Sequence, residues 1–382
     1  MTTVAVTGTG FIGPVHVEAL RRLGIHVRGV LGSSPQKSRD AAQKLGVEIG
    51  YGDYQHIIDD PQVEAIHITT PNNSHFDMSK RAILAGKHVI CEKPLAMTSV
   101  ETAELVALAQ AYPHIVTAVN YNIRFYPVLL HARELVQSGA IGEVYHVRGA
   151  YSQDWLHKAT DWNWRLLPDQ GGDLRAIGDI GTHWMDLTTF VTGLHVESLM
   201  ADLNTFVKTR QKPKQAVATF EGKKEQSAPI ETDPVDIVTD DWGAVIFHYA
   251  GGARGTMNVT QVCAGRKNRV SLEIAGSKGS IAWDGENPNE LWLGHRDRPN
   301  EILIKDPSLM MGRALTHTDY PGGHAEGFPD TFKQLYKAVY GYIANGDYSQ
   351  PKPYPTFEEG HEEIVLCERI LQSHQERRWV TI

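Results

Sequence analysis

A glycine-rich turn after a short apolar run is the feature that most constrains how this chain can fold. Residues 3–7 are predicted to form a buried strand, and Gly8-x-Gly10-x-x-Gly13 follows at once. Residues 14–23 are predicted to form a helix that Gly24 stops, and residues 25–31 a second strand, which together make a βαβ unit. In this setting the glycines bring the backbone close to a pyrophosphate, whose charge the free N–H groups at a helix start favour. A dinucleotide site is therefore expected here, and a simple tight turn is the weaker alternative.

Strands and helices continue to alternate as far as residue 119. Further strands are predicted at 63–69, 88–91 and 115–119, and helices at 35–45, 74–84 and 100–111. Such alternation is typical of a parallel sheet that helices cover on both faces. We therefore predict an α/β chain whose first domain, residues 1–122, has a Rossmann fold.

The pattern changes after residue 122. Helices are predicted at 128–136, after Asp179, at 326–343 and at 357–373, and strands at 144–151, 244–249, 255–261, 270–274 and 280–283. We expect residues 123–382 to form a second α/β domain with a large, mostly antiparallel, open-faced sheet. The C-terminal helices of this domain could pack back on the first domain. The polar segment 208–241 is interpreted as a solvated loop or hairpin extension, with an electrostatic docking arm as the alternative.

Composition and charge restrict the possible partners. The chain has 382 residues, a net charge of −8 and a pI near 6.1, so nucleic acid and anionic membranes are unfavourable partners. No segment has the roughly 18 to 20 consecutive apolar residues that a membrane span needs. Cys91, Cys263 and Cys367 are widely spaced, which argues against a disulfide framework and a structural zinc. Because no leader pattern precedes the first strand, we predict a soluble, cytoplasmic protein. We expect it to act on a small molecule and to contain no metal.

A lysine, an aspartate and a histidine are candidates for one chemical site. Cys91-Glu92-Lys93-Pro94 ends the predicted strand 88–91, so Lys93 should lie at the sheet edge where ligands bind in open α/β folds. Asp179 and His183 are four residues apart, and if Asp179 opens a helix their side chains share one face and can form a hydrogen bond. A histidine so placed can take a proton from a hydroxyl group. The structural alternatives are a surface lysine in a turn, a helix-capping aspartate and a core histidine.

These motifs, in this order, resemble the Gfo/Idh/MocA family, which includes glucose-fructose oxidoreductase and inositol dehydrogenase. The shared motifs span nearly the whole chain and are the glycine loop at 8–13, Thr70-Pro71-Asn72 with His75, Glu92-Lys93-Pro94, Gly171-Gly172 and Asp179-x-x-x-His183. The resemblance implies a Rossmann domain followed by an open-faced α/β domain whose sheet mediates homodimers or homotetramers. It also implies an oxidoreductase that uses NAD or NADP and acts on sugars, polyols or related alcohols.

The resemblance further implies roles for particular residues. Lys93, Asp179 and His183 would be the catalytic set, with Lys93 bonded to the reacting oxygen and His183 exchanging its proton. Cofactor contacts are expected from Gly8, Gly10, Phe11, Ile12, Gly13, Ser33, Ser34, Lys37, Thr70, Pro71, Asn72, His75, Glu92, Lys93, Asn120, Trp164 and Arg165. Candidates for substrate contacts are Tyr121, Arg124, Gln153, Trp155, Trp162, Asp179, His183 and His324, with Tyr151 and Asp154 beside them. For any single tryptophan, core or interface packing is the more ordinary role.

The end of the second predicted strand bears on the choice of dinucleotide. Leu31-Gly32-Ser33-Ser34 lacks the acidic residue that commonly accepts the ribose 2′-hydroxyl in NAD-specific domains. Ser33 and Ser34, with Lys37 or Arg39 nearby, could instead hold a 2′-phosphate, so NADP is slightly favoured over NAD. The alternative is that these serines merely cap the following helix.

Three functions remain open from the sequence. A dehydrogenase acting on a sugar or polyol is the main hypothesis. A dinucleotide-binding sensor or co-regulator without turnover is the second, although a pure sensor has no need of Lys93, Asp179 and His183 together. A glycosidase that oxidises its substrate transiently and holds NAD tightly, without net redox change, is the third.

Overall fold

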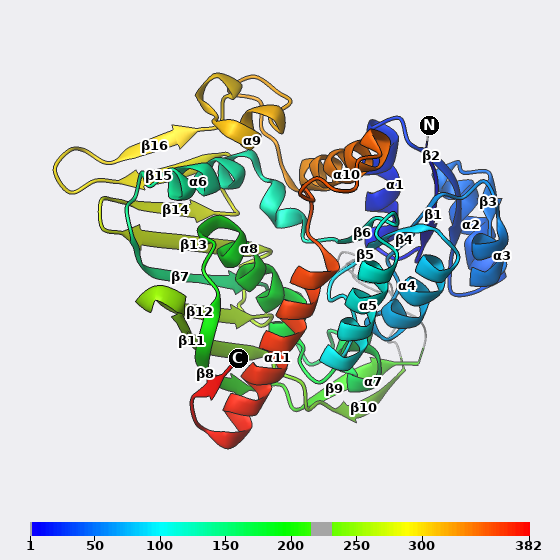
Figure 1. The fold of residues 1–382 in the computed structure, drawn as a ribbon. Helices are drawn as coiled ribbons and strands as arrows, with labels where there is room; N and C mark the ends of the chain where they lie inside the picture. Colours follow the sequence, from blue (N-terminus) through cyan, green and yellow to red (C-terminus); the bar gives the residue numbers. More distant parts are fainter. Residues whose placement is uncertain (1, 215–230) are drawn as a thin grey trace.

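The computed structural model describes residues 2–214 and 231–382, and its first domain is built on a six-stranded parallel sheet (Figure 1). The strand order is β3-β2-β1-β4-β5-β6, and every neighbouring pair is parallel. The strands are β1 (Thr3–Thr7), β2 (His26–Leu31), β3 (Ile49–Gly50), β4 (Ala65–Ile68), β5 (His88–Cys91) and β6 (Thr117–Val119). The helices around them are α1 (Ile12–Arg22), α2 (Pro35–Leu45), α3 (Tyr54–Asp59), α4 (His75–Leu84) and α5 (Ser99–Ala111). The predicted Rossmann arrangement is confirmed.

Helices bury both faces of this sheet, which explains why its strands are nearly continuous apolar runs. Residues of α1 and α2 share one apolar cluster with β1 and β2, and residues of α3, α4 and α5 share another with β4 and β5. The sequence did not predict β3 or α3, because two and six residues are too short to show a periodic pattern. Asp53 nevertheless begins α3, since its carboxylate accepts the His56 N–H.

The second domain is built on a nine-stranded sheet of order β16-β15-β14-β13-β7-β12-β11-β8-β17. Among these described strands only β12 and β7 pair in parallel, so the predicted, mostly antiparallel sheet is confirmed. The strands are β7 (Val144–Ser152), β8 (Val196–Asn204), β11 (Trp242–Tyr249), β12 (Arg254–Thr260), β13 (Arg269–Gly276), β14 (Ser280–Asp284), β15 (Glu290–Gly294), β16 (Glu301–Ile304) and β17 (Val380–Thr381).

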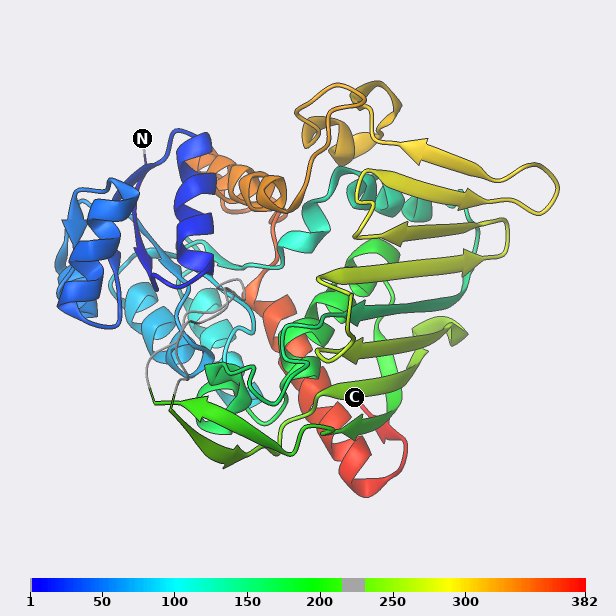
Figure 2. The same ribbon diagram turned by 180° about the vertical axis from the view of Figure 1, so that it is seen from behind.

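In residues 2–214 and 231–382, helices lie against only one face of the large sheet. Figure 1 shows α6 (Pro127–Gln137), α8 (Thr182–Thr192) and α11 (Phe357–Glu376) on that face. Figure 2, from behind, shows the other face with none of the described helices across it. The alternation in β11 follows from this, because Val245 and Phe247 are buried towards the helices while Ile246 between them is exposed.

The C-terminal helix pair also contacts the first domain. Helix α10 (Phe328–Asn345) packs on α1, and its Phe332, Leu335 and Val339 belong to the same apolar cluster as Leu20 of α1. Helix α11 packs on both α5 and β8, so it lies between the two sheets. Of the helices in residues 2–214 and 231–382, none combines the length and apolar character needed to cross a bilayer.

The predicted extension at 208–241 contains a hairpin in its described part. Strands β9 (Thr209–Pro213) and β10 (Thr232–Asp236) pair antiparallel, and residues 215–230 lie outside the described residues. Short elements complete the fold: η1 (Asn72–Ser74), η2 (Asn122–Phe125), η3 (Trp164–Leu166), α7 (Pro168–Gly171), the π-helical turn η4 (Ile177–Gly181), η5 (Ala250–Gly252), η6 (Pro307–Leu309) and α9 (Gly312–Thr316).

Candidate active site

The glycine loop connects β1 to α1 at the carboxyl edge of the parallel sheet. Gly8 has a φ of 95°, and a Cβ there would lie 2.4 Å from the Thr69 carbonyl oxygen. A Cβ on Gly13 would lie 2.0 Å from the Gly8 carbonyl oxygen, so both positions exclude any larger residue. A Cβ on Gly10 would meet nothing within 4 Å, and no side chain caps the first turn of α1. The loop therefore leaves open space and helix N–H groups where an anion would bind, with Phe11 and Ile12 at the start of α1.

The end of β2 bears on the dinucleotide question. Ser34 is the N-cap of α2, because its side chain accepts the Lys37 N–H at 3.3 Å. The capping role that the sequence left open is thus present for Ser34. Ser33, Lys37 and Arg39 are exposed beside it.

The loop after β4 joins the two domains. Asn72 Nδ2 donates to the Gly171 carbonyl oxygen at 2.9 Å, which ties the Thr70-Pro71-Asn72 segment to the second domain. The ring of His75 is fully buried and lies between the carbonyl oxygens of Pro94 at 2.7 Å and Thr70 at 2.9 Å. Burial lowers the pKa of His75. His75 thus connects the two loops rather than facing open space.

Lys93 and Asp179 meet across the two domains in an ion pair that is mostly shielded from solvent, with side chains 10% and 15% exposed. Lys93 Nζ donates to Asp179 Oδ1 at 2.8 Å and to the Asp179 carbonyl oxygen at 2.6 Å. Arg165 Nε donates to the same Oδ1 at 3.1 Å, and Gln261 Nε2 donates to Oδ2 at 2.8 Å. Burial acts to raise the pKa of Asp179, but Lys93 and Arg165 outweigh it and hold that pKa well below its usual range. Asp179 is therefore a fixed anion that orients the ammonium group. The Lys93–Pro94 peptide bond is cis.

The expected hydrogen bond between Asp179 and His183 is not formed. Asp179 lies in the π-helical turn Ile177–Gly181, in which the Thr182 N–H bonds to the Ile177 carbonyl five residues back. This wider turn removes the i, i+4 alignment that an α-helix would give. The Asp179 carboxylate is instead used by Lys93, Arg165 and Gln261.

His183 lies beside this ion pair without a hydrogen-bond partner at Nδ1 among the described residues. Its ring contacts Tyr121 edge-on at 5.7 Å between centroids and Tyr151 at 6.2 Å. Burial lowers the pKa of His183 to about 3, with the Lys93 charge acting in the same direction. The imidazole is therefore neutral near neutral pH and can accept a proton. The buried Tyr121 hydroxyl likewise has no partner in the described chain.

A chain of polar side chains extends from Tyr151. The Tyr151 hydroxyl and Gln153 Nε2 both donate to Asn268 Oδ1, at 2.9 and 2.7 Å. Trp155 Nε1 donates to Gln153 Oε1 at 2.8 Å. Three of the predicted substrate residues are thus connected, with Asn268 as the link between them.

Trp155 and Trp162 also pack on a small apolar cluster that contains Leu156, Leu166 and Ile237. Lys212 of β9 lies over the Trp162 ring at 5.8 Å, so the hairpin extension contacts this segment. The Arg165 guanidinium lies over the Trp164 ring at 4.3 Å. Asp154 forms an ion pair with Lys267 at 2.6 Å.

Arg124 lies in a buried ion cluster rather than at the Lys93 site. Its guanidinium forms two hydrogen bonds with Asp186 and donates to Glu359 Oε1 at 2.7 Å. His324 lies in a loop whose carbonyl groups accept hydrogen bonds from the buried Lys305. The structure records no contact between either residue and Lys93 in the described part of the chain.

Some residues of the site were missed by sequence reasoning. Gln261 donates to Asp179, and the Asp241 carbonyl oxygen accepts the Gln261 N–H at 3.1 Å. Asp240 accepts the N–H groups of Arg175 and Ile177, which fixes the start of the π-helical turn. Gln261 follows β12 directly, so a polar residue at the end of an apolar strand was the available signal.

The residues at the carboxyl edge fit a dinucleotide. Besides the open space at Gly10, Asn120 is buried and its Oδ1 has no partner among the described residues. Asn120 Nδ2 donates to Glu92 Oε1 at 2.5 Å, so the amide oxygen is left free for a ligand. A buried acceptor of this kind suits an N–H donor such as a carboxamide.

A Rossmann domain with an open glycine loop and a lysine at its sheet edge, joined to a second domain that supplies a neutral histidine and the aspartate that binds this lysine, defines a two-domain, dinucleotide-dependent oxidoreductase. Comparison with known families places the chain within this class. Residues 2–121 match a model described as "Oxidoreductase family, NAD-binding Rossmann fold", and residues 129–282 match the "GFO/IDH/MocA C-terminal domain". The chain belongs to the Gfo/Idh/MocA oxidoreductase family.

Individual relatives align over the whole chain. A levoglucosan dehydrogenase from Pseudarthrobacter phenanthrenivorans is 29% identical over 99% of this chain and 97% of its own. An oxidoreductase domain protein from Kribbella flavida is 30% identical, with a TM-score of 0.87 and complete coverage of both chains. An inositol dehydrogenase homolog from Azotobacter vinelandii, solved with NAD⁺, is 26% identical with a TM-score of 0.86, covering 100% of this chain and 97% of the other.

Proposed function

We propose that the protein transfers hydride between a nicotinamide cofactor and a hydroxyl or keto group of a sugar, polyol or glycoside. The observation that carries the proposal is a neutral, buried His183 beside the Lys93 ammonium group. The similarity to a levoglucosan dehydrogenase and to an inositol dehydrogenase homolog supports this substrate class.

Lys93, Asp179 and His183 form the proposed catalytic set. Lys93 Nζ directs two donors at Asp179, and an ammonium group has three, so one N–H remains for the reacting oxygen. When bound, the nicotinamide supplies or accepts the hydride. His183 takes the hydroxyl proton in the oxidative direction, and Lys93 stabilises the charge that develops on the oxygen. Asp179 keeps Lys93 and Arg165 aligned through both hydrogen bonds.

The proposed dinucleotide site spans the carboxyl edge. The pyrophosphate would lie on the glycine loop and the N–H groups of α1, and the nicotinamide carboxamide would reach Asn120 Oδ1. NADP remains slightly favoured over NAD, because Ser33, Lys37 and Arg39 are exposed at the end of β2 and no acid stands there. Ser34, which caps α2, contributes less to this preference than the other three.

The proposed substrate pocket adjoins the nicotinamide. Tyr121 has an unpaired hydroxyl beside His183, and the Tyr151, Gln153 and Trp155 chain offers hydrogen-bonding groups next to aromatic surface. Such a combination suits a hydroxylated ring. Arg124 and His324 have their recorded contacts elsewhere and are the weaker candidates.

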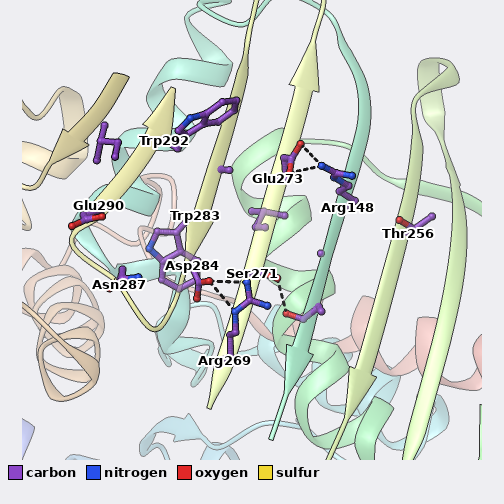
Figure 3. A pocket seen from close by; sticks show the side chains of 15 residues that line it. Arg148, Thr256, Arg269, Ser271, Glu273, Trp283, Asp284, Asn287, Glu290 and Trp292 are labelled. Carbon is purple, nitrogen blue, oxygen red and sulfur yellow. Dashed lines mark hydrogen bonds and ion pairs between the residues drawn. The ribbon is translucent and has the colours of Figure 1, made fainter. Parts of the chain in front are cut away.

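A homodimer or homotetramer through the open sheet is also proposed. One row of neighbouring residues crosses this face from β8 to β16: Met200, Ile246, Thr256, Arg148, Glu273, Ala282, Trp292 and Ile302. Figure 3 shows two ion pairs on this face, Arg148 with Glu273 from the row and Arg269 with Asp284 beside it, around a groove of about 550 Å³. Ile246 and Ile302 are 46% and 61% exposed. Apolar ends and balanced charges in the middle suit a second copy of the same face, which light scattering would detect.

A cytoplasmic location is proposed as well. Cys91, Cys263 and Cys367 are free thiols, and Cys91 and Cys367 are buried. Thiols that are not paired accord with a reducing compartment. Fractionation of the native host would test this location.

The decisive experiment joins binding and turnover. Purified protein is titrated with NADH and NADPH by fluorescence, and the tighter cofactor is then offered with levoglucosan, inositols, aldoses, ketoses and glycosides. A change in nicotinamide absorbance with one compound supports the dehydrogenase and names its substrate class. Tight binding without turnover across the panel would overturn it in favour of a sensor, and glycoside cleavage without net reduction in favour of a redox-neutral hydrolase.

A further inference from the structure

Four polar side chains lie end to end in the interior of the first domain, between β4, α1 and α10. The Tyr340 hydroxyl is 2.7 Å from His67 Nε2, and His67 Nδ1 is 2.9 Å from His16 Nδ1. His16 Nε2 is 3.0 Å from Glu92 Oε1. His16 and His67 are completely inaccessible to solvent. This chain of hydrogen-bonded side chains therefore links α10, in the C-terminal part, to Glu92, which precedes Lys93.

The surroundings of the two histidines offer no other polar partner in the described chain. The His16 ring packs on Phe332 at 5.6 Å and Tyr336 at 5.2 Å between centroids, and Tyr336 also meets His67 at 4.8 Å. Burial lowers the pKa of His67 well below its usual range. If both rings are neutral, each has one N–H donor and one acceptor nitrogen and donates on one side while it accepts on the other.

The acceptor at one end fixes the direction of every hydrogen bond. An ionised Glu92 carboxylate can only accept, so His16 must carry its hydrogen on Nε2 and accept at Nδ1. His67 must then carry its hydrogen on Nδ1 and accept at Nε2, where the Tyr340 hydroxyl donates. With neutral rings, this is the single arrangement that satisfies all three contacts.

Glu92 connects these hydrogen bonds to two residues of the candidate active site. Its Oε2 accepts the Lys93 N–H at 3.1 Å, and its Oε1 accepts from Asn120 Nδ2 at 2.5 Å. Because a carboxylate cannot donate, Asn120 must turn its N–H groups to Glu92 and its Oδ1 away. A protonated Glu92 could instead donate to the amide oxygen and let the Asn120 side chain turn over.

We propose that His16 and His67 are positioning residues: through a one-directional chain of hydrogen bonds from Tyr340 they keep Glu92 a pure acceptor, which fixes the Asn120 amide and the Lys93 backbone. The inference rests on the proposed function for its effect on turnover, because Asn120 and Lys93 are assigned there to the nicotinamide and the reacting oxygen. The hydrogen-bond direction itself does not depend on that assignment.

Other titratable groups also surround the Glu92 carboxylate, and a pH effect must be assigned with all of them in view. They are His16 from α1, His75 from α4, Cys91 and Lys93 from its own segment, His183 from α8 and Tyr336 from α10. Among them His16 alone donates a side-chain hydrogen bond to Glu92 in the described structure. Removing His16 therefore acts on Glu92 most directly.

The first test determines the hydrogen positions in the full-length protein. Nitrogen-15 histidine spectra distinguish the two imidazole tautomers, and His16→Gln and His67→Gln variants assign the signals. We expect the Nε2–H form for His16 and the Nδ1–H form for His67 near neutral pH. A doubly protonated His16, or the opposite tautomer in either ring, would overturn the proposal without reference to any substrate.

The second test measures how the hydrogen-bonded side chains affect cofactor binding and turnover. In His16→Leu, Glu92 loses a donor to its charge, so NADH should bind about 10-fold more weakly. The acid limb of kcat/KM should move up by about one pH unit, because Glu92 is more easily protonated without His16. In His16→Gln one carboxamide can accept from His67 and donate to Glu92, so both properties should recover to within about threefold of wild type.

Controls separate positioning from general damage. The matched variant is His131→Leu, which removes a buried histidine of the second domain and should change neither property. His131 Nδ1 accepts the Met311 N–H at 3.2 Å. Thermal unfolding checks each variant, and if His16→Leu does not fold, His67→Gln and His16→Gln carry the measurement. Wild-type NADH affinity and pH profile in folded His16→Leu would refute the proposal. If wild type turns over no alcohol, the proposed function fails, and the tautomers and NADH affinity still decide this inference.

Discussion

Two aspartates flank His183 along the chain, and the structure uses them in opposite ways. Asp179, four residues before, accepts from Lys93, Arg165 and Gln261. Asp186, three residues after, is held by Arg124, whose guanidinium also donates to Glu359 at 2.7 Å. Asp186 is buried, Asp179 is mostly shielded, and both are paired with a cation.

The difference between them lies in the polar atoms nearby. Beside the Asp179–Lys93 pair the described structure leaves His183 Nδ1 without a partner, and Asn120 Oδ1 is likewise unpartnered next to Glu92, the residue before Lys93. Around Asp186 the guanidinium of Arg124 directs donors at two carboxylates and also lies over the Phe190 ring at 5.0 Å. Buried polar atoms without partners are rare in proteins, and a group of them beside a charge indicates a ligand site. An arginine bonded to two carboxylates and packed on an aromatic ring indicates a structural role.

The largest effect should come from breaking the structural pair. Arg124→Met leaves Asp186 and Glu359 close together without their shared cation, and loss of one partner of a buried ion pair costs about 3 to 5 kcal/mol. Urea unfolding should show this loss, while the folded fraction keeps its NADH affinity. Unchanged stability with abolished turnover would instead return Arg124 to the substrate site, where the family resemblance placed it.

Replacing Lys93, the cation paired with Asp179, should lower turnover rather than stability. Lys93→Met removes the donor to the reacting oxygen, so turnover should fall by roughly 10²-fold or more while the cofactor still binds. Steady-state kinetics and NADH fluorescence measure the two properties on one preparation. The variant His183→Ala should show the same loss of turnover and the same retained cofactor binding. Wild-type turnover in both variants would refute the assignment of the catalytic set.

The comparison also shows which part of the site was predictable from the sequence. The glycine loop, Lys93 and His183 follow from local motifs, since each stands at a strand end or helix start that the apolar pattern marks. The Asp179–His183 hydrogen bond was predicted wrongly, because a π-helical turn cannot be recognised from spacing alone. The sheets were predictable because alternation reports burial directly.

Residues that act over long sequence distances could not be predicted in this way. Gln261 reaches Asp179 across 82 positions, and His67 reaches Tyr340 across 273. Histidines at positions 16 and 67 fall within apolar runs that predict only a helix face and a buried strand. Their partners are set by how α10 packs on the first domain, which no local pattern contains.

A smaller effect should separate the two aspartates by their charge alone. Asp179→Asn keeps the shape but removes the anion that aligns Lys93 and Arg165, and hydrogen bonds to a charge contribute about 1.5 to 3 kcal/mol. We expect kcat to fall by about 10-fold or more, with KM for the cofactor nearly unchanged. In Asp186→Asn the loss should be in stability rather than in kcat. Equal kinetic losses in both variants would mean that Asp186 also acts on the reacting groups.

The smallest effect concerns the histidine between the two aspartates. Burial lowers the pKa of His183 from 6.5 to about 3, so the unfolded chain takes up a proton that the folded protein refuses. His183 therefore costs no stability above about pH 7, and the free energy of unfolding falls by up to about 1.4 kcal/mol per pH unit as the pH drops below about 6.5. His183→Gln should remove this part of the acid sensitivity, measured by urea unfolding at a series of pH values. His67 and His75 are also buried with lowered pKa values and remain in the variant, so the difference between the two curves isolates His183. Parallel plots of unfolding free energy against pH for wild type and variant would mean that the imidazole is protonated in the folded protein. His183 could then not act as the proposed proton acceptor.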